Sequence, residues 1–262
     1  YYMNEIFSKW EKLNFHRKLQ IILLLSFIIR LTVLSKETYI SRDAVLYIRI
    51  ASKINESGFS EGIALCPWLP PLFPIICSIP GKLNLPPILT LQIFFISLSC
   101  LGILFLTKLV REIFNEEVAL ICSLIMALHP KLVDYSFAIN REAVYFPVLL
   151  ASIYFTYLFL KYDKLRWIIL SGVLCGVSYL CRQEALELPL TLILITPIVF
   201  YKDAIKGRQT LKAFFICTLI FSATIIPIYI FSQGTNSTWD PFASKRTQGF
   251  LQDLNSSSSE EK

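Results

Sequence analysis

The sequence has few charged residues for its length: Asp, Glu, Lys and Arg make up only 17% of its 262 residues. Hydrophobic residues make up 55%, which exceeds the roughly 45 to 50% of soluble domains. The sequence also lacks a continuous basic face, because Lys and Arg occur in short clusters between apolar runs. The net charge of +6 therefore does not indicate nucleic acid binding and is instead typical of topology determinants. These features predict an all-α protein that crosses a membrane several times.

Other features that the sequence lacks exclude further classes of protein and site. No CxxC or similar spacing is present among the seven cysteines, so the sequence predicts no cysteine metal site. Five of them fall within or at the end of apolar runs and are predicted to be small packing residues, whereas Cys66 and Cys77 are the pair that could meet outside the membrane. A glycine-rich phosphate loop is missing, as is a convincing internal repeat, which argues against a transporter. No small-x-small cleavage site follows the first apolar run, so we do not interpret it as a signal peptide.

Apolar runs recur along the chain and predict seven spanning helices. The predicted runs are 19–34, 88–107, 118–128, 143–160, 167–181, 186–201 and 213–231. Several are shorter than the roughly 20 residues of an ideal span, so interfacial residues or neighbouring helices must extend or bury their ends.

The charges between these runs predict the orientation. Basic residues precede the first run, which places the amino terminus in the cytoplasm. The connections 108–117, 161–166 and 202–212 are then cytoplasmic, and each contains at least two Lys or Arg residues. The outer segments are 35–87, 129–142, 182–185 and the polar tail 232–262, which is expected to be disordered or the start of a further region.

The first outer segment contains the polar stretch SRDAVLYIRIA, residues 41–51, with Asp43 at its centre. Because Asp43 and Tyr47 are four residues apart, a helix here would place them on one face, with Ile48 and Ala51 adding to an apolar stripe. Asp43 either caps this helix or presents a carboxylate for chemistry. The proline-rich stretch that follows predicts a short juxtamembrane helix over 72–79 beside the Asp43 segment.

Polar residues also gather in the other two outer connections. The second contains Asp134, Asn140, Arg141 and Glu142, and the third contains Arg182, Gln183, Glu184 and Glu187. Charged groups beside spanning helices are costly unless they pair or line a wet cavity. Two interpretations stay open: a functional site, or topology-fixing pairs of Arg141 with Glu142 or Asp134 and of Arg182 with Glu187. Similarly, Arg30 near the outer end of the first span either extends to the interface or faces the cavity.

Taken in order, these residues resemble the GT-C glycosyltransferases of the protein O-mannosyltransferase and aminoarabinose-transferase type. The resemblance covers most of 19–201, and its matching features follow the family's order: Arg30, then Asp43 with Tyr47 and Ala51, Pro70-Pro71-Leu72 with Gly81, the ALHP sequence at 127–130 before Arg141 and Glu142, and finally Arg182. Ala44 and Leu69 depart from it, since many relatives have a second acidic residue and the aminoarabinose enzymes a Lys at those places.

The resemblance implies a GT-C-like module over 1–231, with a first extracytoplasmic loop at 35–86. It implies inverting transfer of a sugar from a polyprenyl-phosphate donor to a protein, lipid or glycan acceptor. Asp43 would be the catalytic base, and Tyr47, Arg42, Arg49, Arg141, Glu142 and Arg182 would bind substrate. Tyr47 either binds the donor or holds its helix in the membrane interface.

The missing glycine-rich loop disfavours a nucleotide-sugar donor. No cofactor is implied, and a divalent metal is left open. The expected location is the plasma (inner) membrane if the source is bacterial. The alternatives are a non-catalytic GT-C relative that serves as an assembly partner and, less favoured, a transporter.

Overall fold

The computed structural model describes residues 11–35, 41–66 and 69–234, and the predicted tail from residue 235 onward lies outside these residues. Every element within the described part is helical. The elements, in chain order, are α2 (Phe15–Leu34), α3 (Arg42–Ser57), α4 (Phe59–Ala64), α5 (Leu72–Lys82), α6 (Pro87–Ile113), α7 (Glu116–Leu128), α8 (Pro130–Phe137), α9 (Glu142–Tyr162), α10 (Leu165–Tyr179), the 3-10 turn η1 (Gln183–Leu186), α11 (Glu187–Lys202) and α12 (Ala204–Gly234).

Each predicted apolar run falls on a helix, which confirms the all-α membrane fold class. Four helices of the described part are long and apolar enough to cross a membrane, namely α6, α9, α12 and α11 together with η1, and a fifth span arises if α7 and α8 count as one bent span. The α2 helix contains Arg17, Lys18 and Arg30, and α10 has only 15 residues. A count of seven spans therefore stays a prediction.

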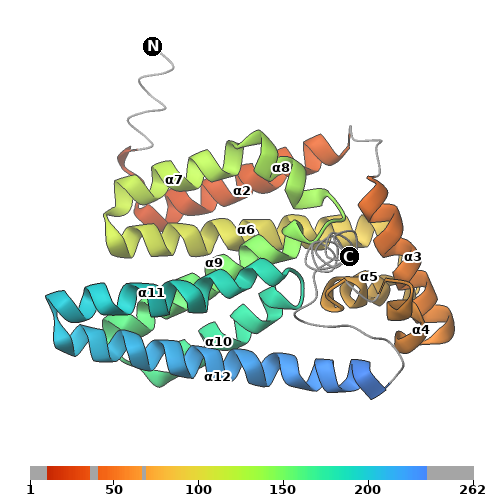
Figure 1. The fold of residues 1–262 in the computed structure, drawn as a ribbon. Helices are drawn as coiled ribbons and strands as arrows, with labels where there is room; N and C mark the ends of the chain where they lie inside the picture. The colour runs from red at the N-terminus through yellow and green to blue at the C-terminus, as the bar shows by residue number, and fades with distance from the viewer. Residues whose placement is uncertain (1–10, 36–40, 67–68, 235–262) are drawn as a thin grey trace, which may run out of the picture.

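The long helices lie side by side with their connections at two opposite ends (Figure 1). The α6–α7 and α11–α12 connections lie at the left-hand end of the view, and α3, α4 and α5 gather at the right-hand end. Ion pairs join the connections of the first end: Lys161 Nζ lies 2.5 Å from Glu112 Oε2, and Lys212 Nζ lies 3.2 Å from Asp163 Oδ1. We call this the basic end and the other the α3 end.

Small residues bring α9, α10 and α12 close together. A Cβ built on Gly172 would lie 2.8 Å from Ile220, and one on Gly176 would lie 2.7 Å from Thr224, so neither position has room for a side chain. Between α9 and α10, Ser152 Oγ donates to Ser171 O at 2.8 Å. Close backbone approach with polar groups satisfied across the interface is how helices associate in lipid.

The sequence predicted a polar loop for the second outer connection, but the structure has a helix there. Residues Pro130–Phe137 form α8, which continues α7 after a bend of 62°. Pro130 lacks an N–H and occupies the first turn of α8, so the α7 hydrogen-bond ladder stops before it. The α8 helix directs the chain from the end of α7 toward Asn140, whose side chain accepts the Ala143 N–H at 3.1 Å at the start of α9.

Both interpretations of Arg30 were wrong. Its side chain is fully buried in the described part of the structure and does not extend to a membrane interface. Its Nη1 donates to Ala127 O at 3.0 Å and to Ser26 O at 3.2 Å, so it joins α2 to the end of α7 rather than lining a site.

Candidate functional site

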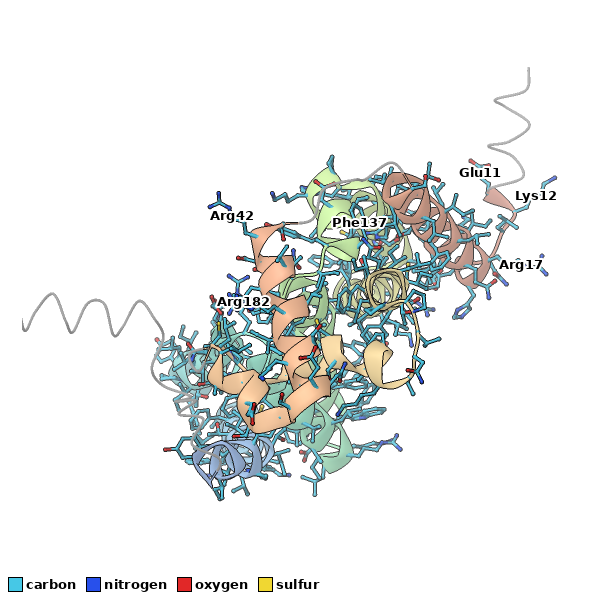
Figure 2. The ribbon with its side chains drawn as sticks, turned by 90° about the vertical axis from the view of Figure 1, so that its right-hand side faces the viewer. Glu11, Lys12, Arg17, Arg42, Phe137 and Arg182 are labelled. Carbon is cyan, nitrogen blue, oxygen red and sulfur yellow. The ribbon has the colours of Figure 1, made fainter. Side chains whose placement is uncertain are left out.

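Asp43 lies at the exposed start of α3. Ser41, rather than Asp43, caps the helix, because Ser41 Oγ accepts the Ala44 N–H at 3.2 Å. This corrects the capping interpretation of Asp43, whose carboxylate lies in the first turn and faces solvent. Figure 2 looks onto this end, where Arg42 projects outward from the start of α3. Arg42 and Arg49 are both exposed and make no ion pair within the described residues.

Tyr47, one turn after Asp43, fastens α3 to the rest of the protein. Its side chain is 3% exposed, and its ring packs edge-on against Phe73 of α5, with centroids 4.7 Å apart. The two rings belong to a core cluster that also contains Ala143 and Cys181. The predicted short helix beside the Asp43 segment is thus confirmed as α5, and Tyr47 is held inside the protein rather than in a membrane interface.

The environment of Tyr47 shows which charges are near it. Burial raises the pKa of its hydroxyl to about 12, the charge of Arg141 opposes this rise, and the charges of Asp43 and Glu142 add to it. Tyr47 therefore stays protonated at neutral pH and keeps a hydrogen to donate. Asp43, Arg141 and Glu142 thus lie close enough for their charges to act on one hydroxyl, although they come from two segments about a hundred residues apart in the sequence.

Arg182 and Glu142 form an ion pair at this end. Arg182 Nη1 donates to Glu142 Oε1, and Arg182 Nε lies 3.0 Å from Glu184 Oε1. The guanidinium also lies over the Tyr145 ring, 5.5 Å from its centroid. The pairing of Arg182 with Glu187 was therefore wrong, since two other carboxylates hold Arg182. In Figure 2, Arg182 lies to the same side of α3 as Arg42.

Arg141 differs from Arg182 in having no partner of opposite charge. It is the residue before α9, is partly exposed, and forms no ion pair or hydrogen bond through its side chain within the part of the chain that the structure describes. Its pairing with Glu142 or Asp134 was thus also wrong. Besides Tyr47, its charge acts on the thiol of Cys181, just past α10. Arg141 is accordingly an uncompensated cation between α3, α9 and the end of α10.

A small cavity with a mainly apolar lining adjoins Glu142 on the side of α6 and α8. Its volume is about 20 Å³, and Ser99, Tyr135 and Glu142 are among the residues that line it. A cavity of this size accepts about one water molecule. Among the described residues, no group of three or more His, Cys, Asp or Glu side chains lies close enough together to hold a metal ion.

Cys66 and Cys77, the pair that the sequence allowed to meet outside the membrane, do not meet at this end. Both are free and buried, Cys66 in a cluster between α3 and α4 and Cys77 in the cluster around Tyr47. The sequence also did not predict the contact between the start of α5 and the end of α10. There, Leu72 N donates a hydrogen bond to Leu180 O at 3.1 Å. The only local signal for it was the Pro70-Pro71-Leu72 start of α5.

Comparison with known proteins identifies the family of this arrangement. A family model described as dolichyl-phosphate-mannose-protein mannosyltransferase matches residues 69–231. The chain belongs to this family. The match covers more than half of the 262 residues and includes Arg141, Glu142 and Arg182, whereas Asp43 and Tyr47 precede it. No match to the chain was found among curated proteins.

Membership confirms the resemblance inferred from the sequence. The protein is an integral membrane protein and a glycosyltransferase of the GT-C type. A family of this kind uses a lipid-linked sugar in a membrane setting, and the α3 end is where this chain assembles charged side chains from distant segments.

Proposed function

We propose that the protein transfers a sugar from a polyprenyl-phosphate donor to an acceptor at the extracytoplasmic face, with inversion at the sugar carbon. The observation that carries this proposal is that Tyr47 and Ala143 share one buried cluster. The cluster brings the exposed carboxylate of Asp43 and the unpaired guanidinium of Arg141 to the same end of the bundle. A base and an anion-binding cation at one place are what this transfer requires.

The reaction follows from these groups. The acceptor oxygen attacks the anomeric carbon from the face opposite the phosphate, and the bond between that carbon and the phosphate oxygen breaks with its electrons passing to the phosphate. A hydroxyl acceptor loses its proton to the Asp43 carboxylate. If the acceptor is itself an ionised phosphate, no base is needed and Asp43 orients the substrate instead.

The two arginines then have different roles. Arg141 has no carboxylate partner among the described residues, so it is available to contact two oxygens of the departing phosphate. Arg182 is already held by Glu142 and Glu184, so we assign it a positioning role. It fixes the start of α9, and with it Arg141, against the segment that follows α10. Arg42 and Arg49 extend the positive charge along the exposed face of α3.

The proposed orientation places the α3 end outside and the amino terminus in the cytoplasm. Support comes from the basic connections 108–117, 161–166 and 202–212, since Lys and Arg favour the cytoplasmic side. Ion pairs between these connections group them at the end opposite α3. In a bacterial cell the membrane would be the plasma membrane. The acceptor remains one of the three classes: protein, lipid or glycan.

The second candidate function is a non-catalytic relative that assembles with other proteins. The observation that favours it is the family match itself, which begins at residue 69 and so leaves out α3 with Asp43. A relative that kept the helical module but no longer used its first loop for catalysis would give such a match.

The test of the proposed function is sugar transfer by the purified full chain and its Asp43→Asn variant. With a polyprenyl-phosphate sugar and a hydroxyl acceptor, the variant should lose about 10² to 10⁴-fold in rate because it cannot accept a proton, while donor binding changes little. Glu56→Gln, which neutralises another exposed carboxylate of α3, serves as the control and should keep the parent rate.

Full activity of the Asp43→Asn variant would remove Asp43 from the mechanism. Donor binding without transfer in the parent chain would favour the non-catalytic relative.

A further inference from the structure

A charged pocket lies at the basic end, at the opposite end of the bundle from Asp43 and Arg141. Its volume is about 500 Å³, and it lies between the end of α9 and the start of α12. Three cationic side chains line it, Lys161, Arg208 and Lys212, together with the single carboxylate of Asp163. No residue of the α3 end contributes to it.

The positive charge of this pocket is only partly compensated. Lys212 pairs with Asp163 at 3.2 Å, but both side chains are more than half exposed, so the pair is weak. Lys161 pairs with Glu112, which is not among the lining residues. Arg208 is exposed and makes no ion pair or hydrogen bond through its side chain within residues 11–35, 41–66 and 69–234. A free guanidinium thus faces a cavity with two lysines beside it.

Apolar side chains adjoin the pocket on the outer surface of the bundle. Ile205, which lines it, is 81% exposed, and nearby Tyr201 is 92% exposed. Further along α12, Phe215 and Leu219 are also exposed. In an integral membrane protein such a surface faces acyl chains. Positive charge at the mouth of an acyl-facing surface is the pattern that binds lipid head groups at the cytoplasmic side.

Another pocket of the basic end lacks this pattern. It has a volume of about 410 Å³ and lies between the start of α2 and the start of α7. Two carboxylates, Glu116 and Glu117, line it, and its Arg111 is bound by Glu116 at 2.6 Å. Of these two pockets, the α9–α12 pocket is the one that combines an unpaired arginine with adjoining exposed apolar side chains.

We propose that the α9–α12 pocket binds the phosphate of an anionic phospholipid. Arg208 contacts two phosphate oxygens, Lys161 and Lys212 add charge, and the acyl chains lie along the exposed side of α12. A zwitterionic lipid is bound less well because its own ammonium group meets the same cations. The proposal is independent of sugar transfer, since it uses other residues at the other end.

The experiment is lipid binding to the purified full chain, followed by native mass spectrometry and by thermal stability. The probes are phosphatidylglycerol, phosphatidylcholine and inorganic phosphate. We expect the parent chain to retain and be stabilised by phosphatidylglycerol in preference to phosphatidylcholine. Arg208→Gln should weaken that binding about fivefold, since each cation near an anionic lipid contributes roughly that factor. Lys108→Gln, an exposed cation of the same end outside the pocket, is the matched control and should bind as the parent does.

Asp163→Asn provides a test in the opposite direction. Asp163 adopts a left-handed backbone conformation, with φ of 49°, which Asn tolerates well, so the variant should fold. Because it removes the single carboxylate that lines the pocket, it should strengthen phosphatidylglycerol binding. Equal binding of both lipids by the parent, equal loss in Lys108→Gln, or unchanged binding in Asp163→Asn would each overturn the proposal. Full stabilisation by inorganic phosphate alone would show a free-anion site instead of a lipid site.

Discussion

At the scale of single residues, the difference between Arg141 and Arg182 is the main result. They come from separate segments, yet one is unpaired and the other is held by Glu142 and Glu184. An arginine already bound by two carboxylates offers less to an incoming phosphate than one with no partner. We therefore expect the donor phosphate to depend on Arg141 directly and on Arg182 through its position.

A thermal-shift measurement with and without polyprenyl phosphate tests this assignment. Arg141→Gln should abolish most of the lipid-induced stabilisation, and Arg141→Lys should reduce it in part, because lysine keeps the charge but not the two-pronged contact. In both variants the stability without lipid should stay near that of the parent, since the side chain has no partner to lose in the described structure. Undiminished stabilisation in Arg141→Gln would place the phosphate elsewhere, with Arg42 and Arg49 as the next candidates.

Arg182 should give a different result, because removing it leaves Glu142 partly buried without its partner. Arg182→Gln alone and Glu142→Gln alone should each lower the melting temperature, whereas the double variant should recover part of the loss. The coupling free energy in this double-mutant cycle should fall between about 0.5 and 3 kcal/mol, and it is best measured by unfolding in detergent. Additive losses would mean that the pair contributes no stability. Arg182→Gln with Glu187→Gln is the control, since those two residues are not paired.

The sequence predicted these residues better than it predicted their partners. The four-residue spacing of Asp43 and Tyr47 was sufficient to place both at the start of one helix. Charge near the span ends indicated Arg141 and Arg182 as candidates, and the structure places both at the α3 end. The partner of Arg182 was not predictable, because Glu187 is five residues away while Glu142 is forty residues away and comes close only when α9 and α10 pack together.

At the scale of the elements, the bend between α7 and α8 depends on a residue from a third helix. Pro130 has no N–H for the last turn of α7, and the bend carries Lys131, which would normally donate to Ala127 O, into α8. Arg30 of α2 supplies the missing donor at 3.0 Å. Since α8 leads directly to the Asn140–Glu142 segment, Arg30 helps to position the α3 end without belonging to it.

Arg30→Met should therefore destabilise the protein by about 1–3 kcal/mol, the range for leaving a buried polar group without its partner. The measurement is unfolding of the detergent-purified chain. Arg17→Met makes the same substitution at an exposed position of the same helix and should have little effect. Equal stability of the two variants would mean that a water or a relaxed α8 replaces the guanidinium.

Apolar runs predicted the helices because each run must satisfy its own backbone hydrogen bonds in lipid. Their ends and bends were less predictable. The run 118–128 was too short for a span, and the explanation is that α8 continues it at an angle. The polar residues of HPKLVDYSF hid that helix, although Pro130 stands where a helix start favours proline.

At the scale of the whole molecule, the two ends of the bundle differ in how their charged residues are arranged. The basic end has Lys and Arg in every connection, and the α3 end combines Asp43, Glu142 and Glu184 with arginines. The Lys and Arg residues in the connections of the basic end support the proposed orientation by the positive-inside rule. Because the two proposed sites, one for the sugar donor and one for an anionic lipid, lie at opposite ends, they would open to opposite leaflets.

Single-cysteine labelling in intact cells tests that orientation, in a chain whose seven native cysteines are replaced. Cysteines at Lys164 and Lys206, both exposed at the basic end, should resist a membrane-impermeant thiol reagent until the cells are opened. A cysteine at Glu56 should react at once, because Glu56 is exposed on α3 and forms no ion pair among the described residues. Glu56 is preferable to Asn55, whose side chain donates to Ser78 O at 3.1 Å. Ser237 lies outside the described residues, and a cysteine there should react as the one at Glu56 does.

Labelling of Lys164 and Lys206 from outside, with Glu56 protected, would show the opposite orientation, with Asp43 in the cytoplasm. The donor would then have to be presented from that side, where the absence of a glycine-rich phosphate loop disfavours a nucleotide sugar.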